Sequence, residues 1–233
     1  MSLVFIISAP SGSGKSTLVA EIQKLIKGLE FSVSYTTRTP RGSECEGREY
    51  YYVNRAEFER MIGEDAFLEH ADVFGNYYGT HRHFLDDARA KGNDLLLDID
   101  VQGAAQVRKK LPDAISIFVL PPSRRELELR LKRRSSAENV RDQEIINRRL
   151  QTASREIENY EEYDYILVNN ILEDSIEALK AIIMTERRKH AGGEPAAEEP
   201  EMQRLADDCL LANARPRVQP ILASFAQESA VRE

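Results

Sequence analysis

Short apolar runs alternate with amphipathic segments along the first 190 residues of the chain. Runs typical of buried strands occur at 3–8, 95–99, 115–120 and 165–168. Between them, apolar positions recur at helical spacing over 16–27, 84–91, 103–111, 123–133, 143–160 and 174–189. Fully apolar strands that alternate with helices are typical of a parallel sheet covered on both faces. The pattern therefore predicts an α/β protein.

Two regions interrupt this alternation. Residues 31–83 are polar and aromatic, and their short strands look antiparallel, which indicates an insertion that projects from the sheet. Residues 124–149 are helical and rich in arginine.

The composition changes again after His190, where Gly, Ala, Pro and Glu dominate. Residues 191–233 hold eight acids against four arginines, a net charge of −4. The segment 190–233 is therefore expected to be a flexible acidic tail. The alternative is one short helix near Leu205 and Leu210, with Ile221 and Phe225 docked on the domain.

The segment after the first apolar run has the form of a phosphate-binding loop. It reads Ala9-Pro10-Ser11-Gly12-Ser13-Gly14-Lys15-Ser16. Its glycines let backbone N–H groups close around an anion, and the following helix points its positive end at the same place. In this motif the lysine reaches the β- and γ-phosphates, and the hydroxyl of Ser16 binds Mg²⁺. Ala9 stands where the pattern usually has glycine.

Length, charge and cysteine content narrow the class further. The chain has 233 residues and a net charge of −7, from 32 basic and 39 acidic side chains, which argues against a nucleic-acid-binding protein. Its two cysteines form neither a disulfide framework nor a metal motif. No apolar stretch reaches the roughly 18 residues of a membrane span, and the start lacks signal-peptide features. The expected location is the cytoplasm.

A second anion site is indicated within 31–83. Arg38 and Arg41 flank a turn stiffened by proline, and guanidinium groups bind phosphate in a bidentate manner. Tyr50 and Tyr78 offer phenolic donors. Glu69 is an acceptor-only carboxylate, which suits a base that presents paired N–H donors. The alternative is a surface turn with solvated arginines.

Five stretches, taken together and in order, resemble guanylate kinase, and the resemblance runs from about Ser2 to Lys189. They are SAPSGSGKST at 8–17, TTRTPR at 36–41, GNYYGT at 75–80, LDIDVQG at 97–103 and YDYILVN at 163–169. The resemblance implies a P-loop kinase fold within 2–189, whose parallel core is flanked by helices. That core would comprise 2–30, 84–123 and 150–189, with a small mixed α/β monophosphate-binding insertion at 31–83 and a helical lid at 124–149.

The implied reaction is ATP + GMP to ADP + GDP, in purine nucleotide metabolism and GMP recycling, with dGMP as a further acceptor. By similarity, the GMP phosphate is held by Arg38, Arg41, Tyr50 and Tyr78, and the guanine is read by Ser34, Glu69 and Thr80. Guanine offers N1–H and an amino group side by side to one carboxylate, whereas adenine would leave Glu69 unpaired. Asp98 and Asp100 would lie beside the metal and the monophosphate, although acids at strand ends are also frequent helix caps.

On the ATP side, the resemblance assigns the loop Ala9–Ser16 together with Asn169. Mg²⁺ would enter as Mg-ATP, with Ser16 as its protein ligand. Lys15, Arg134 and Arg149 are the expected catalytic groups, and Arg130 matches a further lid arginine. The lid departs from the family pattern, because Arg133 and Ser135 flank Arg134 where glycines are common, and Arg148 competes with Arg149.

Two alternatives remain beside an ATP-dependent GMP kinase. Guanylate-kinase-like binding modules bind proteins without chemistry, but they typically have degraded phosphate loops, whereas Gly14, Lys15 and Ser16 are intact here. A kinase for another monophosphate is disfavoured by Glu69 with its neighbouring hydroxyls. The expected partners are therefore ATP and GMP, with no nucleic acid, no membrane and no obligatory protein partner.

Overall fold

A computed structural model describes residues 2–73, 75–137, 143–193 and 200–226, and the side chains of 134–137 lie outside the described part. The chain divides into two compact units. One comprises Met1–Ile6 and Lys27–Ile115, and the other comprises Ile7–Ile26 and Ser116–Glu233. The division passes through the first strand, β1 (Val4–Ser8), which belongs in part to each unit.

The larger sheet has five strands in the order β2-β7-β1-β8-β9. Besides β1, its strands are β2 (Leu29–Phe31), β7 (Asp94–Asp98), β8 (Ile115–Leu120) and β9 (Tyr165–Val168). The pairs β2–β7 and β8–β9 run parallel, and β1 and β8 are buried along their whole length. These features confirm the predicted α/β class. Only β2 escaped the sequence pattern, because three half-buried residues are too few to show a period.

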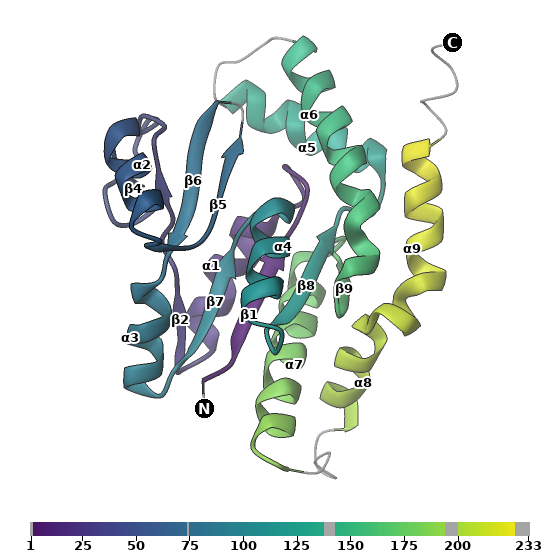
Figure 1. Cartoon of the computed structure of the whole chain (residues 1–233). Helices are drawn as coiled ribbons and strands as arrows, with labels where there is room; N and C mark the ends of the chain where they lie inside the picture. The colour runs from purple at the N-terminus through teal and green to yellow at the C-terminus, as the bar shows by residue number, and fades with distance from the viewer. Residues whose placement is uncertain (1, 74, 138–142, 194–199, 227–233) are drawn as a thin grey trace. The chain divides into compact units, whose positions relative to one another are not determined.

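The second sheet lies within the first unit and has the order β4-β3-β6-β5. Its strands are β3 (Tyr35–Thr36), β4 (Tyr51–Tyr52), β5 (Phe67–Val73) and β6 (Asn76–His81). Figure 1 shows the long β5–β6 pair with β4 and the helix α2 (Arg55–Gly63) on the side of β6. The antiparallel expectation is confirmed for β5–β6 and β3–β6 but wrong for β3–β4, which are parallel. The long connection between β3 and β4 permits this return, since parallel neighbours cannot share a tight hairpin.

Two helices of the first unit begin at a residue whose side chain caps them. Asn54 caps α2 by accepting from Glu57 N, and Asp100 caps α4 by accepting from Gly103 N. The first unit also contains α3 (His83–Lys91) and α4 (Val101–Lys110). The second unit contains α1 (Lys15–Leu25), α5 (Arg124–Ala137), α6 (Gln143–Ile157), the 3-10 helix η1 (Glu158–Glu162) and α7 (Leu172–His190).

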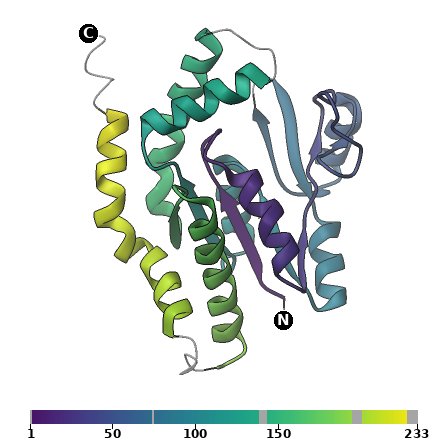
Figure 2. The ribbon, with the colours of Figure 1, turned by 180° about the vertical axis from the view of Figure 1, so that it is seen from behind.

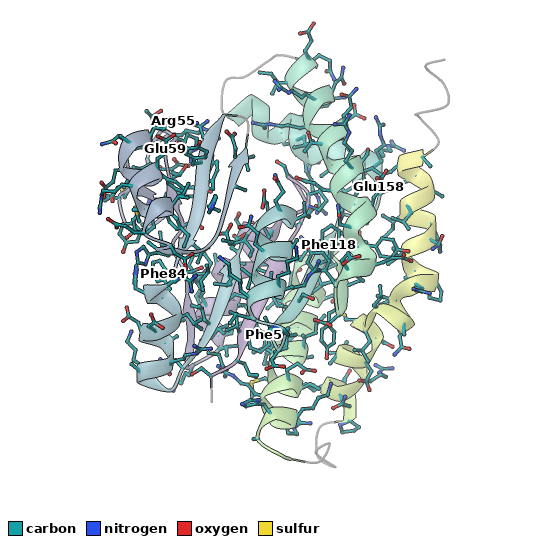
Figure 3. All side chains as sticks on the ribbon, viewed as in Figure 1. Phe5, Arg55, Glu59, Phe84, Phe118 and Glu158 are labelled. Carbon is teal, nitrogen blue, oxygen red and sulfur yellow. The ribbon has the colours of Figure 1, made fainter. Side chains whose placement is uncertain are left out.

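The apolar interior of the second unit is built on β8, β9 and the helices that pack on them. Phe118 of β8, labelled in Figure 3, contacts Tyr163 with ring centroids 4.8 Å apart, and both side chains are buried. The outer helices of the first unit carry ion pairs instead, such as Arg55 with Glu59 at 3.0 Å along α2, which Figure 3 also labels.

The expectation of a flexible tail is corrected by two helices, α8 (Pro200–Cys209) and α9 (Leu211–Ala226). Both views show them, in yellow-green and yellow, beside α7 and β9 (Figures 1 and 2). Leu210 forms an isolated bridge with Tyr165 of β9, and Ser224 Oγ accepts from Arg124 N at 3.0 Å. The physical reason is a narrow apolar stripe that the polar composition conceals, formed by Ala206, Cys209, Ala214, Val218, Ile221 and Phe225. Positions 194–199 and 227–233 of the predicted tail lie outside the described residues.

Within the described residues, none of the helices combines the length and the hydropathy that a membrane-spanning segment requires.

Candidate active site

The loop between β1 and α1 has a backbone shaped for an anion. Gly12 and Gly14 have φ of 93° and 89°, the left-handed region that favours glycine. Ser13 N donates to Pro10 O at 3.1 Å and closes the turn. The helix α1 then begins at Lys15, so that Lys15 and Ser16 stand at its N-terminus, where N–H groups and the helix dipole favour negative charge.

The same glycines are also required by the packing of the second unit. A Cβ on Gly12 would lie 2.9 Å from Leu131 Cδ2 of α5. A Cβ on Gly14 would lie 2.3 Å from Asn169 Nδ2. The loop is therefore enclosed by α5 and by the residue that follows β9, and neither position can accept a side chain without movement.

Two side chains converge on one carbonyl of the loop. Asn169 Nδ2 donates to Ser13 O at 2.7 Å, and Arg130 Nη1 donates to the same oxygen at 3.3 Å. Arg130 Nη2 also donates to Asn169 O at 3.0 Å, and Asn169 is 5% exposed. The structure thus brings Asn169 against the loop with which the sequence grouped it.

The other predicted lid arginines occupy α5 and α6. Arg134 is in α5, but its side chain lies outside the described residues. Arg149 is half-buried on α6, whereas its competitor Arg148 is exposed. In the described part of the chain, no cluster of three or more His, Cys, Asp or Glu side chains has the arrangement of a metal site.

The predicted phosphate-binding residues of the insertion form one cluster in the first unit. Arg38 Nε donates to Tyr78 Oη at 3.2 Å, and Arg38 is only 8% exposed. The ring of Tyr50 lies 5.2 Å from the guanidinium carbon of Arg38 and packs edge-on against Tyr78. Arg41 is exposed. The alternative of a turn with solvated arginines therefore fails for Arg38 and describes only Arg41.

Sequence reasoning missed Glu44, which links this cluster. Glu44 Oε2 lies 2.9 Å from Arg38 Nη1 and accepts from Arg41 N and Tyr52 Oη, both at 2.8 Å. The signal was the spacing Arg38-x-x-Arg41-x-x-Glu44, which places a carboxylate one short turn beyond two arginines.

Two of the predicted base-reading residues, Glu69 of β5 and Thr80 of β6, meet beside α4. Thr80 Oγ1 donates to Glu69 Oε1 at 2.6 Å, and Glu69 is 3% exposed. A Cβ on Gly103 of α4 would lie 2.5 Å from Glu69 Oε2. Gln106 Nε2 donates to His70 O at 2.7 Å, and His70 N donates to Gln106 Oε1 at 3.2 Å. This pair of hydrogen bonds holds α4 against β5. The carboxylate of Glu69 is thus fixed in place.

Burial dominates the protonation of Glu69. It raises the pKa of this carboxyl to about 7, against hydrogen bonds from Thr80, and the charge of Asp100 adds to the rise. Burial likewise raises the pKa of Tyr50. A buried carboxyl group whose pKa is raised to about 7 is typical of a site that binds a polar ligand.

The three remaining predicted residues lie at or beside the ends of strands and helices of this unit. Ser34 precedes β3 and is half-buried, and Asp98 ends β7. Asp100 fulfils the capping alternative, because its Oδ1 accepts from Gly103 N at 2.8 Å. Every predicted GMP residue therefore falls in the first unit, and every predicted ATP residue falls in the second.

A parallel sheet and a glycine-rich loop that leads from β1 into the helix α1 define the class of P-loop nucleotide-binding proteins. Comparisons with known proteins specify the class. The guanylate kinase family model matches residues 1–186. The chain is 56% identical over 222 residues to guanylate kinase of Koribacter versatilis, and this match covers 95% of both proteins.

Two further relatives agree. The chain is 48% identical over 186 residues to guanylate kinase of Escherichia coli K12, a match that covers 79% of this chain and 88% of that protein. Among solved structures, guanylate kinase from Anaplasma phagocytophilum is similar with a TM-score of 0.65 and 35% identity, over 79% of this chain and 86% of the other. The chain belongs to the guanylate kinase family, and it is an enzyme that transfers a phosphoryl group from ATP to GMP.

Proposed function

We propose that Glu69 selects guanine as the acceptor base. The supporting observation is a buried carboxylate, fixed by Thr80 and closely packed on Gly103. A carboxylate has about four lone-pair sites, so Glu69 retains acceptor capacity beyond the bond from Thr80. The N1–H and amino groups of guanine supply two matching donors. Adenine supplies neither at the equivalent positions, and an unpaired buried carboxylate is costly.

The acceptor phosphate is assigned to Arg38, Arg41, Tyr50 and Tyr78. Arg38 and Tyr78 already share a hydrogen bond, which reduces the entropy lost when a phosphate binds. Ser34 is assigned to the guanine. Asp98 and Asp100 are assigned to positions beside the metal and the monophosphate.

The donor triphosphate is assigned to the loop Ala9–Ser16 and to Asn169. The side chain of Asn169 holds this loop through its hydrogen bond to Ser13 O. The exposed hydroxyl of Ser16 suits Mg²⁺, because magnesium binds through few protein oxygens plus substrate phosphates. When bound, Mg²⁺ neutralises phosphate charge. Lys15, Arg134 and Arg149 stabilise the charge of the transferred group, and no side chain forms a covalent bond.

The acceptor range is expected to include dGMP. The assigned contacts go to the base and the phosphate, and none of them requires a 2′-hydroxyl. With these acceptors, the enzyme is assigned to purine nucleotide metabolism and the recycling of GMP.

Product formation with GMP, dGMP and IMP tests this proposal. IMP keeps N1–H but lacks the 2-amino group, so its kcat/KM should fall by about 10- to 100-fold, the value of one hydrogen bond to a charged group. dGMP should stay within about threefold of GMP, and chelation of Mg²⁺ by EDTA should stop turnover with every acceptor. Equal rates with GMP and IMP would contradict the role of Glu69.

A further inference from the structure

Glu44 lies at the centre of the polar network that surrounds Arg38. Its two oxygens form a bidentate pair with Arg38, with Oε2 to Nη1 at 2.9 Å and Oε1 to Nη2 at 3.1 Å. The same carboxylate accepts from Arg41 N and Tyr52 Oη, so it ties the loop that follows β3 to the strand β4. A bidentate guanidinium–carboxylate pair fixes the plane of the guanidinium as well as its position.

The donors of Arg38 are almost fully assigned. A guanidinium has five N–H groups. Nε donates to Tyr78, Nη1 donates to Thr39 O at 2.7 Å and to Glu44, and Nη2 donates to Glu44. Among the described residues, only the second hydrogen of Nη2 has no acceptor. Arg38 therefore presents one defined direction to a ligand.

The surroundings of the pair hold it further. The rings of Tyr50 and Tyr52 lie 5.2 Å and 6.0 Å from the guanidinium carbon. Although burial opposes ionisation, the hydrogen bonds from Arg38, Arg41 and Tyr52 lower the pKa of Glu44 to about 2. Since the lowered pKa stabilises the ionised form at every pH above that value, the pair is intact throughout the range in which the enzyme is assayed.

We propose that Glu44 is a positioning residue for the acceptor phosphate, which acts by fixing the guanidinium of Arg38 and the backbone of Arg41. This inference rests on the proposed role of Arg38. Glu44 itself does not bind the phosphate, because its carboxylate is negatively charged like the ligand.

Charge alone makes the opposite prediction, and this conflict makes the proposal testable. A carboxylate close to a phosphate site repels the dianion, so its neutralisation would tighten GMP binding if Coulombic attraction decided the outcome. Under the proposal, loss of the bidentate pair frees Arg38 to adopt many orientations, and GMP binding weakens because the ligand must order the side chain again.

The experiment compares the affinities of GMP and guanosine for the full chain and for Glu44→Gln, by calorimetry. The variant should bind GMP about 10- to 100-fold more weakly, and guanosine within about twofold of the original protein. Guanosine lacks the phosphate, so it reports any general damage to the insertion. Glu49→Gln is the matched control, because Glu49 accepts from Cys45 N and Arg48 in the same loop and should leave both affinities unchanged.

Arg38→Ala tests the phosphate site separately from the positioning role of Glu44. If Arg38→Ala weakens GMP binding and Glu44→Gln does not, the inference on Glu44 is wrong while the phosphate site stands. If neither variant affects GMP, the proposed phosphate site itself is wrong. Tighter GMP binding by Glu44→Gln, or equal losses for GMP and guanosine, would also overturn the positioning role.

Tyr52→Phe keeps the test decisive if Glu44→Gln does not fold. It removes one donor to Glu44 and leaves the carboxylate in place. GMP binding should weaken by roughly threefold with guanosine unchanged. An unchanged GMP affinity in this variant would count against the network.

Discussion

Thr80 Oγ1 lies 2.6 Å from Glu69 Oε1, and both side chains are almost completely removed from solvent. A hydroxyl has a single O–H donor. Because Thr80 donates to Glu69, its hydroxyl is not free to donate to O6 or N7 of guanine at the same time. Thr80 therefore orients Glu69, and we expect Ser34 to supply the hydroxyl that donates to the guanine carbonyl.

The protonation of Glu69 predicts the pH dependence of base binding. Burial raises its pKa to about 7, and only the ionised carboxylate can accept both guanine donors. Guanosine affinity should therefore rise as pH increases through about 7, by up to about tenfold per unit below it, and level off above. Guanosine is the proper probe, because the phosphate of GMP titrates nearby, with a second pKa of about 6. A guanosine affinity that stays flat between pH 5.5 and 8.5 would contradict this protonation.

The same pKa shift has a consequence for stability. The carboxyl of Glu69 binds a proton more tightly in the folded chain, where its pKa is about 7, than in the unfolded chain, where its pKa has the ordinary value of 4.5. This contribution to the free energy of unfolding is therefore full below about 4.5 and is lost as pH rises toward about 7. Glu69→Gln should remove that part of the pH dependence in urea unfolding, whereas Glu49→Gln should not.

Gly14 tests how tightly the phosphate loop is enclosed. Gly14→Ala must place a Cβ at φ 89° and within 2.3 Å of Asn169 Nδ2. The kcat/KM for ATP should fall by at least about 100-fold, because a small misplacement of the phosphates is enough to lose that factor. Adding Asn169→Ala should restore little, since the backbone strain persists. Gly63→Ala is the control, because a Cβ there meets no atom within 4 Å. Normal kinetics in Gly14→Ala would refute the enclosure.

Lys15 is expected to act on the transferred phosphate and not on the acceptor. Lys15→Ala should lower kcat by about 10²- to 10³-fold, the cost of removing one charge-stabilising donor. Guanosine affinity should stay unchanged. Lys24→Ala on the same helix is the control, since Lys24 is exposed and pairs with Glu21. The assigned role fails if Lys15→Ala turns over at the original rate in a coupled ADP-release assay.

The C-terminal helices should contribute to the stability of the second unit. Phe225 is buried on α9, so Phe225→Ala should destabilise the chain by about 3 kcal/mol, a drop of roughly 6–12 °C in Tm. Leu25→Ala is the control, because Leu25 is exposed on α1. A Tm that Phe225→Ala leaves unchanged would mean that the segment is mobile after all.

The sequence predicted the parts of the fold that carry a strong local signal. The four apolar strands and the phosphate loop were found because their residues are nearly uniform in chemistry. The alternative in which Ile221 and Phe225 dock was disfavoured, although Ala214, Val218, Ile221 and Phe225 follow one another at intervals of four, three and four. Pro216 and Pro220 lie within the helix and favoured the interpretation as a linker.

In the candidate site too, the sequence identifies the residues of motifs but not the residues that support them through tertiary contacts. Motif residues such as Arg38 and Glu69 are identified by their chemistry. The structure places Arg38 in a cluster with Tyr50 and Tyr78 and buries Glu69 beside Thr80. Glu44, Gly103 and Gln106 matter through contacts with those residues, and such contacts are set by tertiary packing. The spacing of Glu44 from Arg38 and Arg41 is a weak signal by itself, because Glu46 and Glu49 lie in the same loop.

The central claim is that Glu69 determines the choice of guanine, and acceptor discrimination tests it most directly. The measurement is the ratio of kcat/KM for GMP to that for AMP, in the original chain and in Glu69→Gln. The ratio should be about 10⁴ or higher originally and should fall by at least about 100-fold in the variant, mainly through loss of activity with GMP. An AMP rate equal to the GMP rate in the original chain, or an unchanged ratio in Glu69→Gln, would contradict the account.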